Sequence, residues 1–208
     1  MRIHSKAMNK RIWHILIAVL ACAMGTVAQK VASDIPITSM TLEENLAIPK
    51  VNSKQKEALR NYMRREAQAL AKMGYTVETD RNGEVIVVTL PASQLFLPNE
   101  TSLTPSGIKK LEPLLSYLKA VNRFKLLAAM HSDNTGSDNY KEQLTTARVD
   151  AVMHYIHANA EYPAQAVGYA MADDEPLRPN TTRANREKNR RLEIYIVPGT
   201  ALLERLKK

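Results

Sequence analysis

The sequence predicts an α/β fold, an α+β sandwich in which helices pack on one face of a mixed sheet. From residue 75 onward, short apolar or alternating runs of strand length take turns with segments whose apolar residues recur at helical spacing. Strands that alternate with helices favour parallel pairing, which gives a βαβαβ-type arrangement. An amphipathic helix over residues 52–74 precedes this region.

The first 28 residues have the order of an export signal. Basic residues precede a run over residues 12–28 that is almost wholly apolar. We therefore expect the protein to be exported, with residues 1–28 serving as a signal peptide or membrane anchor and with synthesis starting at Met1 or Met8. The apolar run has 17 residues, whereas a helix that spans a bilayer takes about 20.

Cys22 lies within this run and is the one cysteine of the chain. The sequence therefore offers neither an internal disulfide nor a thiol-metal cluster. Together with Val19, Leu20 and Ala21, it resembles a lipoprotein cleavage box, so Cys22 is a candidate for lipidation. Two alternatives stay open, which are cleavage by ordinary signal peptidase and an uncleaved anchor.

The chain has a formal net charge of +8. Such an excess favours an anionic partner, and nucleic acid, membrane headgroups and cell-wall polymer all qualify. Nucleic acid is the weakest of the three, because an exported chain with 5% aromatic residues offers few platforms for stacking bases. We expect no nucleic-acid partner.

Residues 29–51 mix Ser, Thr and Pro without periodicity, which predicts a tether. The helix over residues 52–74 is highly charged but carries an apolar stripe, and Gly74 ends it. The stripe consists of Leu59, Tyr62, Met63, Leu70 and Met73. We expect it to pack on the neighbouring domain. The alternative is a coiled coil that makes a homodimer, for which about three heptads are short.

Residues 75–79 and 84–90 have strand patterns, and the turn residues between them predict a hairpin. Thr104 and Pro105 then supply an N-cap and a first helical residue. The helix that follows has apolar residues at helical spacing up to Leu118, and Pro113 is expected to kink it.

Residues 123–130 form an apolar run of strand length, and residues 134–137 have the chemistry of a turn. A long helix is predicted from Asp138 onward, because apolar residues recur at helical spacing as far as Tyr155. Residues 166–171 and 192–197 supply two more strands, with an Arg-rich segment between them. The domain is placed at residues 75–200, and a basic tail is expected over residues 201–208.

Residues 131–148 hold the most informative pattern of the chain. Asp133 follows the strand that ends near His131, and Arg148 lies about three turns into the next helix, on or beside the face turned toward the sheet. A carboxylate and a guanidinium can thus flank one pocket. This pair predicts a small zwitterionic ligand.

Three ordered blocks resemble the OmpA-like peptidoglycan-binding family, whose signature reads H-[ST]-D-x-x-G-x-x-x-Y-N-x-x-L-S-x-x-R. The first block contains Leu95, Phe96, Asn99 and Leu103, the second spans residues 131–148, and the third is N-R-R-L-E-I at residues 189–194. The resemblance covers about residues 84–197. It implies a non-catalytic domain without cofactor or metal that binds peptidoglycan through the diaminopimelate of its stem peptide.

The resemblance implies a role for each site residue. Asp133 would accept hydrogen bonds from the ligand's ammonium, while Arg148 would bind its carboxylate through a bidentate fork. Arg190 would add a second cation beside that carboxylate, and the free N–H groups at the start of the long helix would favour an anion. The candidates at the rim are Asn134, Thr135 and Asn99.

Structural roles are the alternatives. Asp133 could serve only backbone N–H groups in the turn, and Arg148 could extend along the helix surface or pair with Asp150 or Glu142. His131 beside Asp133 invites a metal or acid-base role. One His and one Asp supply too few ligands, so a structural histidine is favoured.

Strand alternation points Arg190 and Arg191 to opposite faces, so at most one of them should reach the ligand. The sequence also departs from the family pattern. The family's asparagine after tyrosine is Lys141 here, which offers an ammonium to another carboxylate. Two positions where the family often carries glycine are Ala170 and Ala172, which puts the local backbone in question.

The leading hypothesis is an exported, periplasmic protein, associated with the outer membrane, that anchors this membrane to the cell wall. One alternative is a stator-like component of an ion-driven motor, but residues 12–28 lack the carboxylate that an ion relay needs. Another is an enzyme that acts on the cell wall, for which the sequence shows no nucleophile with a base, no clear carboxylate pair and no metal set.

Overall fold

The computed structural model describes residues 37–207. The expected signal segment and Cys22 lie outside the described residues. Within residues 37–207, no helix is both long enough and apolar enough to cross a membrane.

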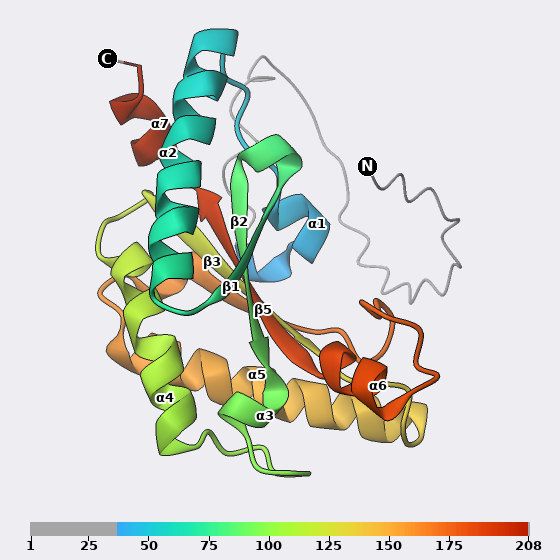
Figure 1. The fold of residues 1–208 in the computed structure, drawn as a ribbon. Coiled ribbons are helices and arrows are strands. Elements are labelled where there is room, and N and C mark those ends of the chain that lie inside the picture. The colour runs from blue at the N-terminus through green and yellow to red at the C-terminus, as the bar shows by residue number, and fades with distance from the viewer. Residues whose placement is uncertain (1–36, 208) are drawn as a thin grey trace, which may run out of the picture. The chain divides into compact units, whose positions relative to one another are not determined.

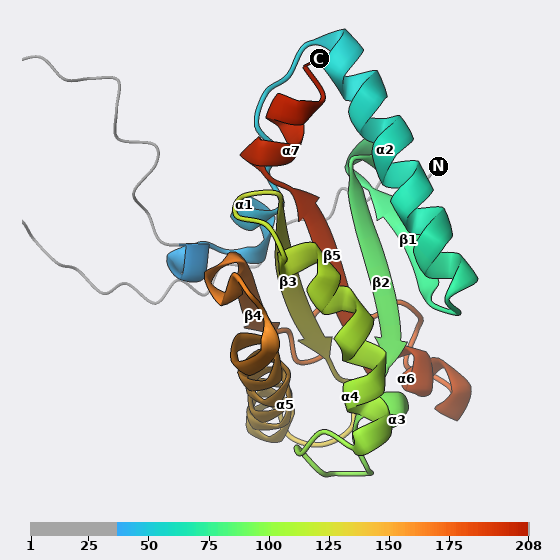
Figure 2. The same cartoon turned by 90° about the vertical axis from the view of Figure 1, so that its left-hand side faces the viewer.

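Five strands form one mixed sheet, as predicted. They are β1 (Thr76–Asp80), β2 (Val85–Pro91), β3 (Phe124–His131), β4 (Ala166–Ala170) and β5 (Arg191–Pro198). Their order across the sheet is β1-β2-β5-β3-β4, so the last strand of the chain lies in the middle (Figure 2). β3 and β4 pair in parallel, and the other neighbours are antiparallel.

Three long helical segments cover one face of the sheet (Figure 1). They are α2 (Ser53–Lys72), α4 (Pro105–Leu111) with the 3-10 helix Glu112–Leu118 that continues it, and α5 (Asp138–Asn159). Thr104 caps α4 through its side chain, and Pro105 is the first helical residue, as expected. The change to 3-10 geometry at Glu112 adjoins Pro113, which cannot donate a helical hydrogen bond.

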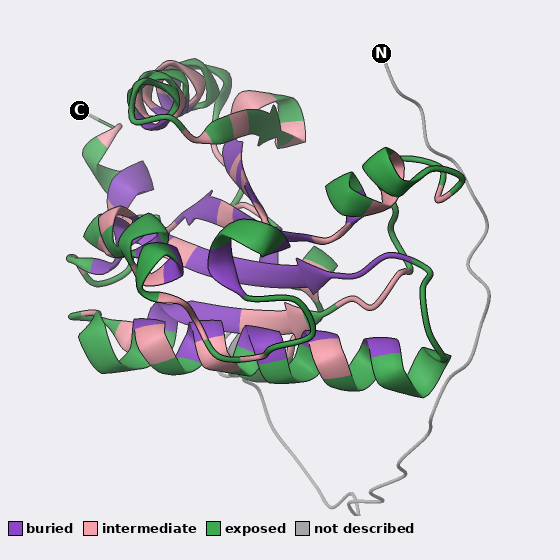
Figure 3. Ribbon diagram, turned by 60° about the horizontal axis from the view of Figure 1, so that its bottom comes forward, coloured by how far each residue is buried: buried purple, intermediate pink, exposed green. Residues whose placement is uncertain are grey.

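The core between this face and the helices accounts for the apolar stripes. In α2, Leu59, Met63 and Leu70 are buried in the same cluster as strand residues such as Ile86. Leu59, Met63 and Leu70 thus pack on their own domain, as the favoured prediction expected, whereas Met73 is 56% exposed. α5 likewise presents one buried side along its length (Figure 3).

The second face of the sheet is also covered, where a tether was predicted. α1 (Leu42–Asn45) lies opposite α2 and α4 (Figure 1). Leu46 is 5% exposed and packs against a second cluster that includes Leu127 and Val197. The tether prediction was therefore wrong for residues 42–48, because strands with apolar residues on both faces need a cover on each. For the same reason, helices do not pack on one face only.

The C-terminal residues differ from the expected basic tail as well. α7 (Thr200–Arg205) buries Leu202 and Leu203 in the main core. The side chain of Gln55 in α2 donates a hydrogen bond to the carbonyl of Leu203 over 3.5 Å. Two leucines in a six-residue helix give too short a pattern to predict from the sequence. The remaining short helices are α3 (Ala92–Leu95) and α6 (Arg183–Asn189).

Candidate ligand-binding site

The candidate site lies where the end of β3, the start of β5 and the start of α5 meet. β3 and β5 are antiparallel with His131 opposite Arg191. The residues just beyond this pair, Asp133 and Arg190, are therefore neighbours in space although 57 positions separate them. The sheet register, and not the local sequence, brings them together.

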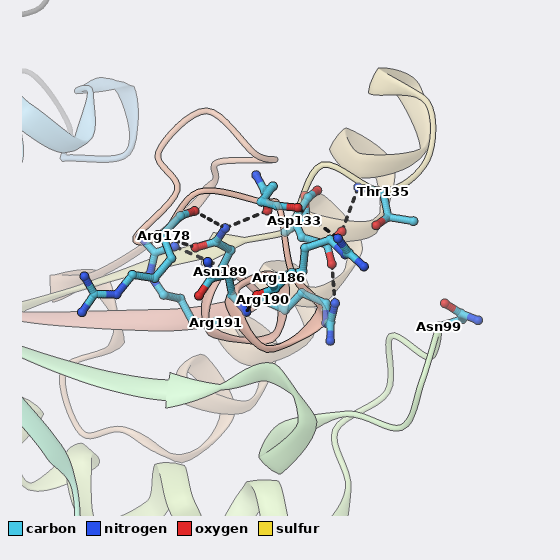
Figure 4. Close-up of polar contacts among 12 residues, drawn as sticks. Asn99, Asp133, Thr135, Arg178, Arg186, Asn189, Arg190 and Arg191 are labelled. Carbon is cyan, nitrogen blue, oxygen red and sulfur yellow. Dashed lines mark hydrogen bonds and ion pairs between the residues drawn. The ribbon is translucent and has the colours of Figure 1, made fainter.

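Asp133 is 4% exposed and uses both carboxylate oxygens (Figure 4). Oδ1 accepts a hydrogen bond of 2.8 Å from the backbone N–H of Thr135, and Oδ2 forms an ion pair with Nη1 of Arg190. Burial raises the pKa of Asp133, but the hydrogen bonds from Thr135 and Arg190 outweigh burial and leave the pKa below its ordinary value. Asp133 thus combines the turn role with a charge partner.

Arg148 is 6% exposed and lies on α5 against the loop that follows α3. Its guanidinium carbon is 4.9 Å from the ring centroid of Phe96. Nε donates to the carbonyl of Glu100 over 2.9 Å, and Nη2 lies 3.4 Å from the carbonyl oxygen of Leu97. Burial lowers the pKa of Arg148, yet a guanidinium stays charged at neutral pH.

The pairing of Arg148 with a nearby helix carboxylate is not observed. Among residues 37–207, Arg148 forms no ion pair with Glu142 or Asp150. Its remaining nitrogen, Nη1, has no hydrogen-bond partner within the described chain. A guanidinium held by backbone carbonyls and an aromatic ring is oriented while keeping its charge uncompensated.

One cavity of about 500 Å³ joins these groups. Asp133, Arg148 and Arg190 line it together with Thr135 and Asn99. Other lining residues are Phe96, Tyr140, Lys141, Arg183 and Glu187. Asn134 is exposed and does not line the cavity, so its expected place at the rim is not observed.

Asn99 lines the cavity from another loop, and its side chain points away from Asp133 (Figure 4). Its backbone has φ 60°, in the left-handed region that asparagine tolerates. Its Oδ1 accepts a hydrogen bond of 3.2 Å from the hydroxyl of Tyr140, which is 42% exposed. The bond ties this loop to the first turn of α5.

Residues 95–190 match the OmpA family. The chain contains an OmpA-like domain. This match spans the first two sequence blocks and the start of the third, and it includes Asp133, Arg148 and Arg190.

Two curated relatives show how far the similarity extends. The chain is 25% identical over 134 residues to "Probable lipoprotein YiaD" of Escherichia coli, which covers 64% of this chain and 61% of the relative. It is 34% identical over 108 residues to "Outer-membrane lipoprotein YfiB" of Pseudomonas aeruginosa, covering 50% of this chain and 62% of the relative. The chain thus spans about three fifths of the length of these relatives.

Solved structures share the fold of the OmpA-like domain. A putative MotB-like protein from Desulfovibrio vulgaris aligns with TM-score 0.60 and 20% identity, over 69% of this chain and 98% of the other. The cell wall anchor of the T6SS from Pseudomonas aeruginosa aligns with TM-score 0.54 and 24% identity, over 65% of this chain and 95% of the other. The mixed sheet with this helix arrangement therefore recurs in other chains.

Arg191 points away from the cavity of the OmpA-like domain, as strand alternation predicted for one of the two arginines. It is 3% exposed, and its Nε lies 2.7 Å from Oε1 of Glu193. His131 is also buried on this side, with Nε2 3.4 Å from Oε2 of Glu193. Within residues 37–207, no group of three or more His, Cys, Asp or Glu side chains could hold a metal ion.

Lys141 meets other carboxylates, as its departure from the family pattern suggested. Its side chain is 8% exposed, and Nζ lies 2.9 Å from Asp138 and 2.7 Å from Asp173. Both hydrogen bonds raise the pKa of Lys141, and the one to Asp173 has the larger effect. The link to Asp173 joins α5 to the loop after β4.

Sequence reasoning missed Arg183 and the role of Phe96 beneath Arg148. Arg183 starts α6 directly after Thr182, which caps that helix, and it lines the cavity. The capping signal of Thr182 could have placed Arg183 on a helix beside Arg190. No sequence signal shows that Arg148 donates to the carbonyls of Leu97 and Glu100.

A larger cavity of about 810 Å³ lies at the other end of the sheet. Its lining is mainly apolar and includes Val121, Phe124, Tyr162 and Pro198. Its charged lining residues include Lys125 and Glu161, but it has no guanidinium that could bind a carboxylate through two parallel hydrogen bonds. The smaller cavity is therefore the better site for a zwitterion.

Proposed function

We propose that the OmpA-like domain binds peptidoglycan without covalent chemistry, and that the diaminopimelate of a stem peptide occupies the cavity beside Asp133. The observation that carries this proposal is the convergence of one buried carboxylate and two guanidiniums, Arg148 and Arg190, on a single cavity. An amino acid end group presents the complementary pair of charges.

The contacts of Arg148 refine how the ligand carboxylate would bind. Because Nε already donates to Glu100, the carboxylate would approach the two terminal nitrogens, where Nη1 lacks a partner among residues 37–207. Arg190 is held at the cavity by Asp133 and would supply the second cation. The ligand ammonium would then share the carboxylate of Asp133 with Arg190.

The names of relatives support an envelope location. They include "Outer-membrane lipoprotein YfiB" and, at 28% identity over 95 residues, "Peptidoglycan-binding protein ArfA" of Mycobacterium tuberculosis. Together with the export-type start of the chain, these names support a periplasmic protein that anchors the outer membrane to the wall. Lipidation of Cys22 would attach it, and mass spectrometry of the mature N terminus tests this.

Substitution of the charged pair tests the proposal. Asp133→Ala and Arg148→Ala, each in the full chain, are expected to abolish retention on purified diaminopimelate-type sacculi. Truncating one partner of a buried charge pair strands the other and costs about 2 to 5 kcal/mol of binding free energy. Sedimentation with sacculi measures retention, and circular dichroism checks that each variant is folded.

Arg178→Ala is the matched control. Arg178 is exposed near the site but does not line the cavity, so this variant removes the same charge and should keep full retention. Unchanged retention in both Asp133→Ala and Arg148→Ala would contradict the proposal. Release of soluble muropeptides by the wild-type chain would contradict a non-catalytic role.

A further inference from the structure

The backbone that leads to Asp133 is held by the loop after β4. The N–H of Ser132 donates to the carbonyl of Ala172 over 2.6 Å, and the N–H of Met171 donates to the carbonyl of Met130 over 2.9 Å. Both bonds lie within three residues of Asp133 along β3 and its extension. The position of Asp133 therefore depends on the conformation of residues 171–173.

This loop conformation is strained at Ala172. Its φ is 41°, in the left-handed region that side chains with a Cβ atom rarely adopt. Such a backbone persists only when the surrounding contacts hold it in place. The carbonyl that accepts from Ser132 belongs to this same residue.

The contact next to Ala172 is the ion pair of Asp173 with Lys141. Lys141 reaches it from the first turn of α5, with its side chain 8% exposed, and Asp173 is 23% exposed. Exposed ion pairs hold structure weakly, but this one is largely shielded from water. The second partner of Lys141, Asp138, is fully exposed and lies on the same helix.

We infer that Lys141 is a positioning residue for the proposed ligand site: through Asp173 it holds Ala172 in the left-handed conformation and so fixes the backbone that presents Asp133. Its effect on binding rests on the proposed function. Its effect on the backbone at Ser132 does not, so the two can be measured separately.

Lys141 also lines the cavity, which suggests a direct ligand contact as the competing explanation. The two explanations differ at residues that the ligand would not touch. Asp173 and Ala172 do not line the cavity. If Lys141 acts through the loop, Asp173→Asn must have the same effect as Lys141→Asn. Adding Ala172→Gly must then reduce the effect of Lys141→Asn, because glycine adopts positive φ without strain.

The experiment compares five variants of the full chain: Lys141→Asn, Asp173→Asn, Lys141→Arg, Asp138→Asn, and Lys141→Asn combined with Ala172→Gly. Amide hydrogen exchange at Ser132 reports the backbone, and retention on diaminopimelate-type sacculi reports binding. We expect Lys141→Asn and Asp173→Asn each to speed exchange at Ser132 and to weaken retention by about tenfold.

The rescue variants and the control sharpen the result. Lys141→Arg keeps a cation, and adding Ala172→Gly to Lys141→Asn removes the strain. Amide exchange at Ser132 and retention on sacculi should therefore stay within about threefold of wild type in both of these variants. Asp138→Asn, which removes only the exposed partner, should change neither. Unchanged Ser132 exchange in Lys141→Asn and Asp173→Asn would overturn the inference.

Two further outcomes are decisive. Loss of retention in Lys141→Asn with normal retention in Asp173→Asn would assign Lys141 to the ligand directly and overturn the positioning role. If the wild-type chain fails to bind sacculi, the proposed function fails, whereas the exchange measurement still decides whether Lys141 holds the backbone.

Discussion

Glu193 is a buried carboxylate on the face of β5 turned away from the candidate site. Arg191 and Tyr195 contact it from the same strand, and His131 contacts it from β3. Burial raises the pKa of Glu193, but the neighbouring His131 imidazole, the charge of Arg191 and the hydrogen bond from the Tyr195 hydroxyl lower it from 4.5 to about 2. The carboxylate is thus held ionised within the sheet, opposite Ala129 of β3.

The lowered pKa of Glu193 predicts a pH-dependent contribution to stability. A carboxyl group with a folded pKa below its unfolded value stabilises the fold above pH 4.5, and this contribution is lost as pH falls through 4.5 toward 2. The shift corresponds to roughly 3 kcal/mol in the free energy of unfolding. In urea denaturation at pH 7, the free energy of unfolding should therefore be higher for wild type than for Glu193→Gln. This difference should narrow steadily below pH 4.5.

Glu142→Gln is the control for this titration. Glu142 is exposed on α5, so the stability difference between this variant and wild type should stay nearly constant with pH. A constant gap for Glu193→Gln over the same range would show that Glu193 carries no stabilising charge interaction.

At the scale of elements, the segment around α1 closes the second face of the sheet. Asn45 is fully buried, and its Nδ2 donates to the hydroxyl of Tyr169 over 2.7 Å. Lys125 donates from Nζ to the carbonyl of Asn45 over 2.5 Å, and burial lowers the pKa of Lys125. The hydrogen bonds of Asn45 and the packing of Leu46 thus hold this short helix over strand residues that water would otherwise reach.

Leu46→Ala tests whether this cover contributes to folding. Leu46 is 5% exposed against the second cluster, so truncation removes buried methyl groups and leaves a cavity. We expect the free energy of unfolding to fall by about 2 to 4 kcal/mol in urea denaturation. Leu177→Ala is the matched control, because Leu177 is 42% exposed and its loss should cost less than about 0.5 kcal/mol.

Equal, small effects of the two leucine substitutions would mean that residues 42–48 act as a tether after all. Faster amide exchange around Leu127 of β3 and Val167 of β4 in Leu46→Ala would instead locate the loss on the covered face.

For the whole molecule, the sequence predicts the elements that have long patterns or local signals. The hairpin, α2, α4 with its change at Pro113, and α5 follow from periodicity, turn residues and caps. α1 and α7 could not be predicted, since four and six residues carry no period and their packing depends on distant strands. Local sequence patterns predict where a helix or strand lies along the chain, whereas the pairing of distant strands decides which elements become its neighbours.

The same distinction applies to the site. The sequence predicts that Asp133 and Arg148 flank one pocket, because a strand end and a helix face place them. It does not predict that Arg190 pairs with Asp133, which depends on the register of β3 and β5, nor that Arg148 donates to Glu100. Asn134 has suitable chemistry but lies outside the cavity lining, since the turn directs it into solvent.

The charge of the whole chain offers a second, non-specific way to hold an anionic wall polymer. The net charge is +8, and residues 1–36 carry five Lys or Arg and one Asp, which leaves +4 on the remainder. Attraction between exposed charges weakens as salt shortens the screening length, from about 10 Å at 0.1 M to about 3 Å at 1 M. Buried charges in a cavity are screened much less.

Salt should therefore separate cavity binding from diffuse attraction. Asp133 and Arg148 are 4% and 6% exposed, so raising NaCl from about 0.05 to 0.5 M should lower retention of the wild-type chain on sacculi by no more than about threefold. Any retention that Asp133→Ala keeps at low salt would rest on diffuse attraction alone, and it should fall to background as the salt concentration rises. Arg178→Ala should follow wild type across the series. Parallel loss of retention in wild type and Asp133→Ala would instead show that net charge, and not the cavity, holds the protein on the wall.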